Sequence, residues 1–326
     1  MPLASSTGLL VTASPRIVSA FGTSEGVHEL LSAIVTEQAR NAGKQFIFVD
    51  AQLLGMTPHM FFRVLHGNRT DLSDLKPDPD QFQALNNAVV LIDHAEELLT
   101  LKRFKASRHI WTFFHELVKR WDVTMFLLWQ TMALMPPELD DGENLDLEPI
   151  GIEECKRYTG YHGYEISDFA AARFLETSNG YLEYCEAFNQ QYRSIDTWDD
   201  RSVGIFRDHL ARMCRDVCRH RWDRALLLAR GYSSLKAVMV ALARLGNRRL
   251  TDIAREIGCS VQATKEYLNE LLPIGMIMHT SRSYRLKDPV FETWIRTIDA
   301  DSGRPLMINR PTVRFFDREE SFLEID

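Results

Sequence analysis

The chain has 326 residues, of which 45% are hydrophobic and 25% are charged, and its formal net charge is −7. This balance excludes fibrous and disordered proteins and gives room for about two domains. The opening residues lack the pattern of a signal peptide, and no apolar run approaches the ~20 residues of a membrane span. The five cysteines form no paired framework, so we expect a cytoplasmic protein without membrane association.

The charge changes sign along the chain. Residues 1–200 carry 16 Lys and Arg against 29 Asp and Glu, whereas residues 201–296 carry 18 against 9. Such asymmetry suggests separate modules, and a basic module is where a polyanionic partner is expected to bind. A solvated basic face, or one that pairs with the acidic half, would explain the same pattern.

Short apolar runs alternate with segments of helical period over residues 1–150, which predicts an α/β core with a parallel sheet. Strands are expected at 17–20, 46–50, 89–93 and 123–129, and helices at 27–40, 58–65 and 107–120. The acidic, proline-bounded stretch 136–151 is expected to be a loop or a domain boundary.

The stretch "RIVSAFGTSEGVHELL" has the strand–turn–helix outline of a phosphate-binding loop. In the pattern G-x-x-x-x-G-K-[ST], Gly26 takes the second glycine, but Phe21 stands at the first, Val27 at the lysine and His28 at the hydroxyl residue. The candidate phosphate-contacting residues are Gly22, Thr23, Ser24, Gly26, Val27 and His28.

The run "NAVVLIDHAEEL" has the form of a Walker B strand. In working ATPases the aspartate at its end helps to hold Mg²⁺ and a following glutamate orients water. Asp93 is present here, but His94 stands where the glutamate is expected. The next predicted strand ends before Gln130 and Thr131, and Thr131 is a candidate γ-phosphate sensor.

Residues 151–245 are expected to form a helical lid and a basic helical region, with Ser167 as a helix N-cap. Arg212, Arg215 and Arg219 fall near one face if the basic stretch is one helix, which would suit a phosphate backbone or acidic core residues. Cys214 and Cys218 are one helical turn apart, but nearby histidines match no common zinc spacing, so no metal site is expected.

Residues 246–298 have the rhythm of a helix–turn–helix followed by a hairpin, which predicts a winged helix. Thr251 and Ser260 are the expected N-caps, Gly258 the turn, and Val261 one of the buried positions. If this unit binds DNA, the second helix would present Gln262, Lys265 and Asn269 to the major groove, with Arg282 and Arg285 on the wing meeting phosphate. Residues 299–326 form a C-terminal tail.

Several of these segments together resemble the archaeal-type ATPases of the STAND/AAA+ group. They are "FGTSEG", "FIFVDAQ", "VVLIDHAEEL", "AARFLETSNGYLEY" and "YRLKDPVFETWI", and the likeness covers about residues 14–296. The resemblance implies a P-loop core, a helical lid and a C-terminal winged helix. It also implies that Lys119 and Arg120 occupy the place of a finger toward a neighbouring nucleotide, and that Arg173 occupies that of a sensor.

The substitutions at Val27, His28 and His94 indicate a degenerate site. We therefore expect a catalytically inactive AAA+/STAND-like adaptor or regulatory subunit that binds protein partners. The partners could belong to an AAA+ complex or to a complex of the transposition, replication or defence type. Binding of double-stranded DNA and formation of an oligomer are left open. No cofactor is expected, although weak binding of ATP or ADP stays open. The alternatives are a winged-helix DNA-binding regulator and an ATPase with atypical nucleotide ligands.

Overall fold

The computed structural model describes residues 16–52, 58–65, 78–101, 109–140, 142–147, 149–192, 198, 200–228 and 232–301. The predicted tail therefore lies almost wholly outside the described residues, as do the first two residues of the helix predicted at 107–120. Among the described residues, no helix is both long and apolar enough to cross a membrane.

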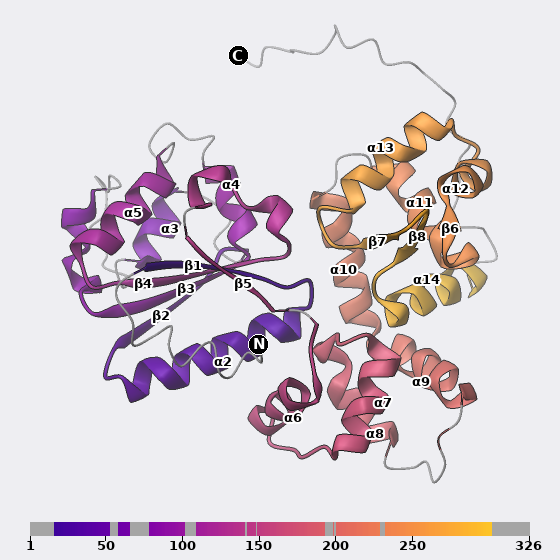
Figure 1. Ribbon diagram of the computed structural model, residues 1–326, viewed down its shortest axis with the longest axis horizontal. Coiled ribbons are helices and arrows are strands. Elements are labelled where there is room, and N and C mark those ends of the chain that lie inside the picture. Colours follow the sequence, from indigo (N-terminus) through magenta and orange to yellow (C-terminus); the bar gives the residue numbers. More distant parts are fainter. Residues whose placement is uncertain are drawn as a thin grey trace, which may run out of the picture.

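A five-stranded parallel sheet forms the centre of the N-terminal core, which confirms the predicted α/β class (Figure 1). Its strands are β1 (Arg16–Phe21), β2 (Gln45–Asp50), β3 (Ala88–Asp93), β4 (Thr124–Trp129) and β5 (Glu143–Asp146), in the order β2-β3-β4-β1-β5. Strands β3 and β4 are buried along their whole length, as expected for near-continuous apolar runs between two helical layers.

Successive residues of each strand point to opposite sides of the sheet, and each side has its own apolar core. Val18, Leu91 and Phe126 pack with the long helix α2 (Glu25–Asn41), while Ile17, Val90 and Met125 pack with α5 (Ile110–Arg120). Helix α2 therefore covers one face of the sheet, and α3 (Pro58–Leu65), α4 (Leu98–Leu101) and α5 lie over the other (Figure 1). Four short 3₁₀ turns complete the core: η1 (Pro79–Leu85), η2 (Ala95–Glu97), η4 (Met132–Leu134) and η5 (Pro137–Leu139).

The stretch 136–151, predicted to be a loop or a domain boundary, is not a plain loop. The segment contains η5 and the edge strand β5, in which Val18 pairs with Glu143 and Phe21 with Asp146. The sequence of β5, "ENLD", has no apolar run because three of its four residues are exposed. Its strand conformation comes from pairing with β1 rather than from its own composition.

A group of helices follows the core, and we call residues 152–213 the lid. It comprises α6 (Ile152–Tyr161), α7 (Asp168–Ser178), the 3₁₀ turn η6 (Leu182–Tyr184), α8 (Cys185–Tyr192) and α9 (Asp200–Met213). The predicted cap is confirmed, because the Ser167 hydroxyl accepts a hydrogen bond from the Ala170 amide at 3.2 Å. Helix α10 (Arg215–Leu228) begins a new helix after Cys214, so Arg212 is not on the helix that carries Arg215 and Arg219, and the single basic helix predicted there was wrong.

The remaining elements are α11 (Tyr232–Leu245), β6 (Arg248–Arg249), α12 (Leu250–Ile257), α13 (Val261–Leu271), β7 (Ile277–Thr280), β8 (Ser283–Leu286) and α14 (Pro289–Asp301). We call residues 248–301 the C-terminal module. The turn at Gly258 (φ +67°) and the cap at Ser260 are as predicted. Thr251 is not a cap, because α12 begins at Leu250 after Arg249, and Val261 is 47% exposed rather than buried.

Candidate nucleotide site

The turn between β1 and α2 lies at the carboxyl ends of the parallel strands, where ligands of open α/β sheets bind. Asp93 ends β3, and Thr131 follows the end of β4, which pairs with β1 along its whole length. The fold therefore brings together the residues predicted for a nucleotide site from three separate strands. Their partners, however, are other protein groups.

His28 and Asp93 form a buried pair in the middle of the site. His28 Nδ1 lies 2.7 Å from Asp93 Oδ1, and His28 Nε2 lies 2.8 Å from the Gly22 carbonyl oxygen. Both ring nitrogens face acceptors, so the ring satisfies both only as an imidazolium. Burial opposes that charge, but the Asp93 carboxylate outweighs it and raises the pKa of His28, and His28 in turn lowers the pKa of Asp93 despite its burial.

His94 repeats this arrangement beside the first pair. Its Nδ1 lies 3.1 Å from Asp50 Oδ1, and its Nε2 lies 3.1 Å from Glu25 Oε2. Burial disfavours the charged ring, yet the hydrogen bonds to Asp50 and Glu25 and the nearby charge of Asp93 raise the pKa of His94 to about 10. His94 also adopts the left-handed conformation at φ 55°, which turns its ring from the strand end toward α2.

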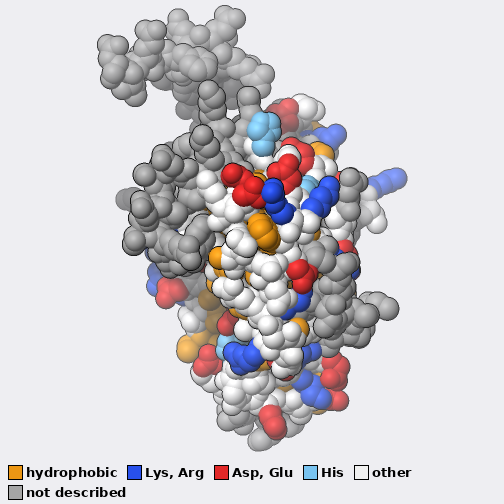
Figure 2. Space-filling model, turned by 90° about the vertical axis from the view of Figure 1, so that its left-hand side faces the viewer, with side chains coloured by type: hydrophobic (Ala, Val, Ile, Leu, Met, Phe, Trp, Pro, Cys, Tyr) orange, Lys and Arg blue, Asp and Glu red, His pale blue; other side chains and the backbone are white. Residues whose placement is uncertain are grey.

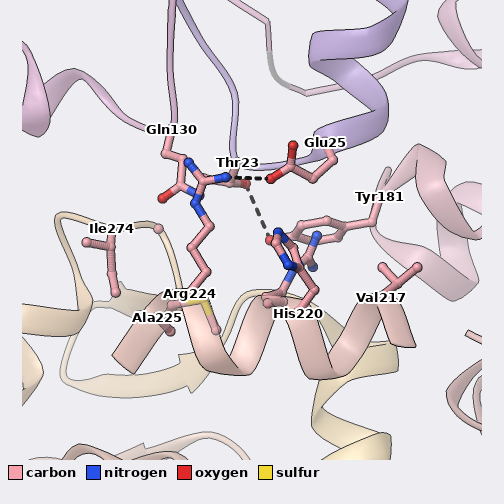
Figure 3. A pocket seen from close by; sticks show the side chains of 12 residues that line it. Thr23, Glu25, Gln130, Tyr181, Val217, His220, Arg224, Ala225 and Ile274 are labelled. Carbon is pink, nitrogen blue, oxygen red and sulfur yellow. Dashed lines mark hydrogen bonds and ion pairs between the residues drawn. The ribbon is translucent and has the colours of Figure 1, made fainter. Parts of the chain in front are cut away.

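Arg224 closes the site from helix α10. Its guanidinium donates to Glu25 Oε1 at 3.1 Å and to the buried carboxylate of Glu96. Figure 3 shows Arg224 rising from α10 toward Glu25 at the start of α2. Arg224 is 5% exposed, so this cation has left water almost completely and depends on its two carboxylate partners.

These seven residues form what we call the ion-pair cluster: Glu25, His28, Asp50, Asp93, His94, Glu96 and Arg224. Three cationic groups, two imidazolium rings and one guanidinium, alternate with four carboxylates. Where a working P-loop presents Lys and Mg²⁺ to a polyphosphate, this cluster presents cations to its own carboxylates. Among the described residues, no three His, Cys, Asp or Glu side chains are placed to hold a metal ion.

The turn itself is covered by the lid and the C-terminal module. The Ser24 hydroxyl donates to Glu183 Oε2 at 2.5 Å, and Lys287 Nζ donates to the Thr23 hydroxyl at 3.0 Å. Val27, at the lysine position, is fully buried, and the Thr131 hydroxyl donates to the Pro273 carbonyl. The two hydroxyls of the turn and the predicted sensor thus all contact protein groups.

Two glycines permit this close packing. A Cβ atom on Gly26 would lie 2.7 Å from Leu182 Cβ and 2.8 Å from the Glu183 amide nitrogen of η6. A Cβ on Gly275, whose φ is +69°, would lie 2.2 Å from Thr23 Cγ2. Gly26 is therefore required by the contact between α2 and the lid, whether or not a phosphate ever approaches it.

A second arginine of α10 joins the lid to the C-terminal module. Arg221 binds the carboxylates of Glu183 and Asp288, and its guanidinium lies 4.2 Å from the centre of the Tyr181 ring. Tyr184 donates its hydroxyl to Asp288 at 2.6 Å. Asp288 also accepts the backbone amides of the first turn of α14, so this buried group fixes the start of that helix.

Little space is left at the centre. The cavity between Thr23, Glu25, Gln130 and α10 holds about 40 Å³, room for a few water molecules at about 10–15 Å³ each. Figure 3 shows its wall, with Gln130 above α10 and Tyr181 from the lid beside it. This space is too small for a nucleoside triphosphate, but a second cavity of about 290 Å³ adjoins the same turn, between Ser24, Asn179, Tyr181 and Lys287.

The other predicted residues lie away from this cluster. Gln262, Lys265, Asn269, Arg282 and Arg285 are all exposed on the C-terminal module. Arg120 pairs with Asp80 at 2.6 Å and Lys119 is exposed, while Arg173 pairs with Glu176 at 2.7 Å on its own helix. On the face of the core that Figure 2 shows, acidic and basic side chains are interspersed.

Sequence reasoning missed Glu25, Asp50, Arg221 and Arg224 as members of the site. Arg224 lies 128 residues from Glu96 in the chain, so no local pattern links them. The available signal was the pair of substitutions at His28 and His94. The pattern places a metal-binding hydroxyl and a carboxylate where this chain has two histidines. The positive charge that a bound Mg²⁺ would supply is thus supplied here by side chains of the protein.

The fold resembles that of known ATPases. The Walker-type ATPase PABY2304 of Pyrococcus abyssi matches with a TM-score of 0.61 and 13% identity, over 90% of this chain and 94% of that chain. A RuvB protein of Thermotoga maritima matches at TM-score 0.44 and 14% identity, over 87% of this chain and 88% of that chain. The STAND protein PH0952 of Pyrococcus horikoshii matches at 0.38 and 11%, over 91% of this chain and 42% of that chain.

No protein-family model matches the sequence, and no curated protein sequence matches it. At these identities the likeness establishes the fold alone, an α/β core with a parallel sheet followed by a helical extension, and the comparison with the P. abyssi ATPase carries it.

Proposed function

We propose that this protein is a catalytically inactive AAA+/STAND-like adaptor or regulatory subunit of a multiprotein assembly. The observation that carries the proposal is the His28–Asp93 pair. The aspartate that would help to hold Mg²⁺ is bound to an imidazolium at 2.7 Å, and that imidazolium stands where the second metal-binding group is expected. To bind Asp93, a divalent cation would first have to displace the positively charged ring of His28.

Energetic considerations support loss of turnover. A charge-assisted hydrogen bond is worth about 1.5–3 kcal/mol, so the absence of a lysine at Val27 weakens phosphate binding about 10- to 100-fold. Binding of a triphosphate would also separate Arg224 from Glu25 and Glu96, leaving buried carboxylates without a partner. Any residual affinity for ATP or ADP is therefore low.

The adaptor role follows from what the cluster holds in place. The chain's own side chains join α2 to the lid, to helix α10 and to the C-terminal module. A subunit fixed in this way can present constant surfaces to protein partners. We expect these partners to include AAA+ proteins or proteins of a transposition, replication or defence complex.

Nucleotide binding and turnover test the proposal directly. With about 1 mM ATP and Mg²⁺ the melting temperature should stay unchanged, because a ligand that binds only the native state raises apparent stability. Hydrolysis should stay at background in the wild type and in Asp93→Ala. ATP hydrolysis that disappears in an Asp93→Ala variant shown by circular dichroism to be folded would establish instead an ATPase with atypical ligands. Copurification from the native host, followed by mass spectrometry, would identify the partners.

A second candidate function is a winged-helix DNA-binding regulator. Arg282 and Arg285 support it, because both are exposed on the hairpin and neither forms an ion pair with a carboxylate of the described residues. This function and the adaptor function are compatible, since a regulatory subunit can bind DNA and protein with different surfaces.

A further inference from the structure

The C-terminal module carries four exposed arginines around one small sheet. Arg248 and Arg249 form β6, Arg285 lies on β8, and Arg282 lies in the turn between β7 and β8. Arg248 is opposite Tyr284 and so belongs to the other side of the sheet from Arg249 and Arg285. We call Arg249, Arg282 and Arg285 the arginine face. We propose that the arginine face binds the phosphate backbone of duplex DNA, in place of the helix α13 that the sequence pattern favours; this inference rests on the DNA-binding function proposed above.

The strand register places Arg249 and Arg285 on one side of the sheet. Arg249 is opposite Ser283 and Arg248 is opposite Tyr284 in the antiparallel pair of β6 and β8. Ser283 and Arg285 are two residues apart and so point to the same side, which makes Arg249 a diagonal neighbour of Arg285 at about 7–8 Å. The opposite side of β8, with Tyr284 and Leu286, is buried against the module.

None of the four guanidinium groups forms an ion pair within the part of the chain that the structure describes, and of the four only Arg285 acts electrostatically on a nearby carboxylate there, that of Glu292. Arg248 donates to the Asn247 carbonyl at 3.3 Å and Arg285 to the Met278 sulfur at 3.0 Å. Nearby arginines differ, because Arg244, Arg255 and Arg296 each pair with a carboxylate. Unpaired, exposed guanidinium forks are suited to bidentate contacts with phosphate.

Helix α13 is poorly suited to contact DNA. Its exposed residues include Lys265 but also Glu266 and Glu270, so the helix would bring more negative than positive charge to the phosphates. Gln262, a candidate for adenine, already donates to Glu266 at 3.1 Å. The arginine face has no such acidic residue in its strands, and contacts to phosphate from its three arginines would be independent of sequence.

The test uses the full chain and a fluorescently labelled mixed-sequence duplex of about 20 base pairs, titrated between about 50 and 200 mM NaCl. Three phosphate contacts predict a slope of log K against log salt of about −2.7. The variant Arg249→Gln with Arg285→Gln should bind at least ~10-fold more weakly, and its slope should be shallower by about 1.8.

Two control variants separate the alternatives. Arg212→Gln with Arg219→Gln removes the same charge from α9 and α10, and Lys265→Gln with Asn269→Ala alters α13; both should stay within about twofold of wild type. Loss of binding in the α13 variant but not in the arginine-face variant would overturn the inference and leave DNA binding intact. A wild-type chain that does not bind the duplex at about 50 mM salt would overturn both, and binding of polyglutamate alone would assign the face to an acidic protein.

Discussion

His28 Nδ1 lies 2.7 Å from Oδ1 of Asp93, although the two residues occupy the positions of a metal-binding hydroxyl and a metal-binding carboxylate. At the centre of the candidate site the two side chains therefore bind each other. Their contacts, and those of the residues around them, have consequences that can be measured.

Asp93→Ala should destabilise the protein strongly. It leaves the buried His28 ring without its carboxylate, and breaking a buried ion pair on one side costs about 3–5 kcal/mol. Urea denaturation measures the free energy of unfolding. The double variant His28→Leu with Asp93→Ala should lose less than the sum of the single variants. Additive losses would show that the two residues do not interact.

Arg224→Met should also lower stability by about 3–5 kcal/mol, because the carboxylate of Glu96 is 4% exposed and would lose its partner. Arg219→Met is the matched control on the same helix. Its side chain is 69% exposed and pairs only with Asp223, so the change should stay within about 0.5 kcal/mol. Equal losses in the two variants would contradict the role given to Arg224.

The raised pKa of His94 predicts that the free energy of unfolding falls at alkaline pH. Its pKa is raised to about 10 in the folded protein against about 6.5 when unfolded, so its contribution is complete below pH 6.5 and disappears as the pH rises toward 10. One proton sets a limit of about 1.4 kcal/mol per pH unit. In His94→Asn the slope between pH 7 and 10 should be smaller. His209→Asn is the control, because burial and Arg212 lower the pKa of His209 and it titrates below this range.

Gly26→Ala should destabilise by about 1–3 kcal/mol, since its Cβ would meet Leu182 and the Glu183 backbone at 2.7–2.8 Å. Gly160→Ala, in helix α6 where nothing lies within 4 Å of the added carbon, should instead stabilise by about 0.4–1 kcal/mol. Thermal melting of both variants without nucleotide measures the difference. A neutral Gly26→Ala would mean that α2 and η6 can move apart freely.

Much of the fold could be predicted from local pattern. Strands β1 to β4 and helix α2 are long apolar or amphipathic runs, and Ser167, Gly258 and Ser260 act on their own neighbours in the chain. β5 could not be predicted, because its acidic residues form a strand only beside β1. The residues predicted for a nucleotide site do lie together at the carboxyl ends of the strands, but their protein partners could not be predicted.

One physical cause explains why part of the site could not be predicted from the sequence. Arg224 and Glu25 are far apart in sequence, and whether a charged residue is solvated or buried against another charge depends on the packing of whole helices. The same limit explains Val261. Its spacing predicted a buried position, yet the start of α13 lies at the surface, where no element covers 47% of the side chain.

Arg221 and Arg224, two of the arginines of α10, have a consequence for how the molecule unfolds. Arg221 holds the lid and the C-terminal module, and Arg224, one helical turn later, holds the core. If one of these parts unfolded alone, buried charged groups in the other parts would lose their partners. Partial unfolding is therefore energetically unfavourable. The described parts should therefore unfold in a single cooperative transition, with calorimetric and van't Hoff enthalpies in agreement, unlike a chain of loosely tethered domains.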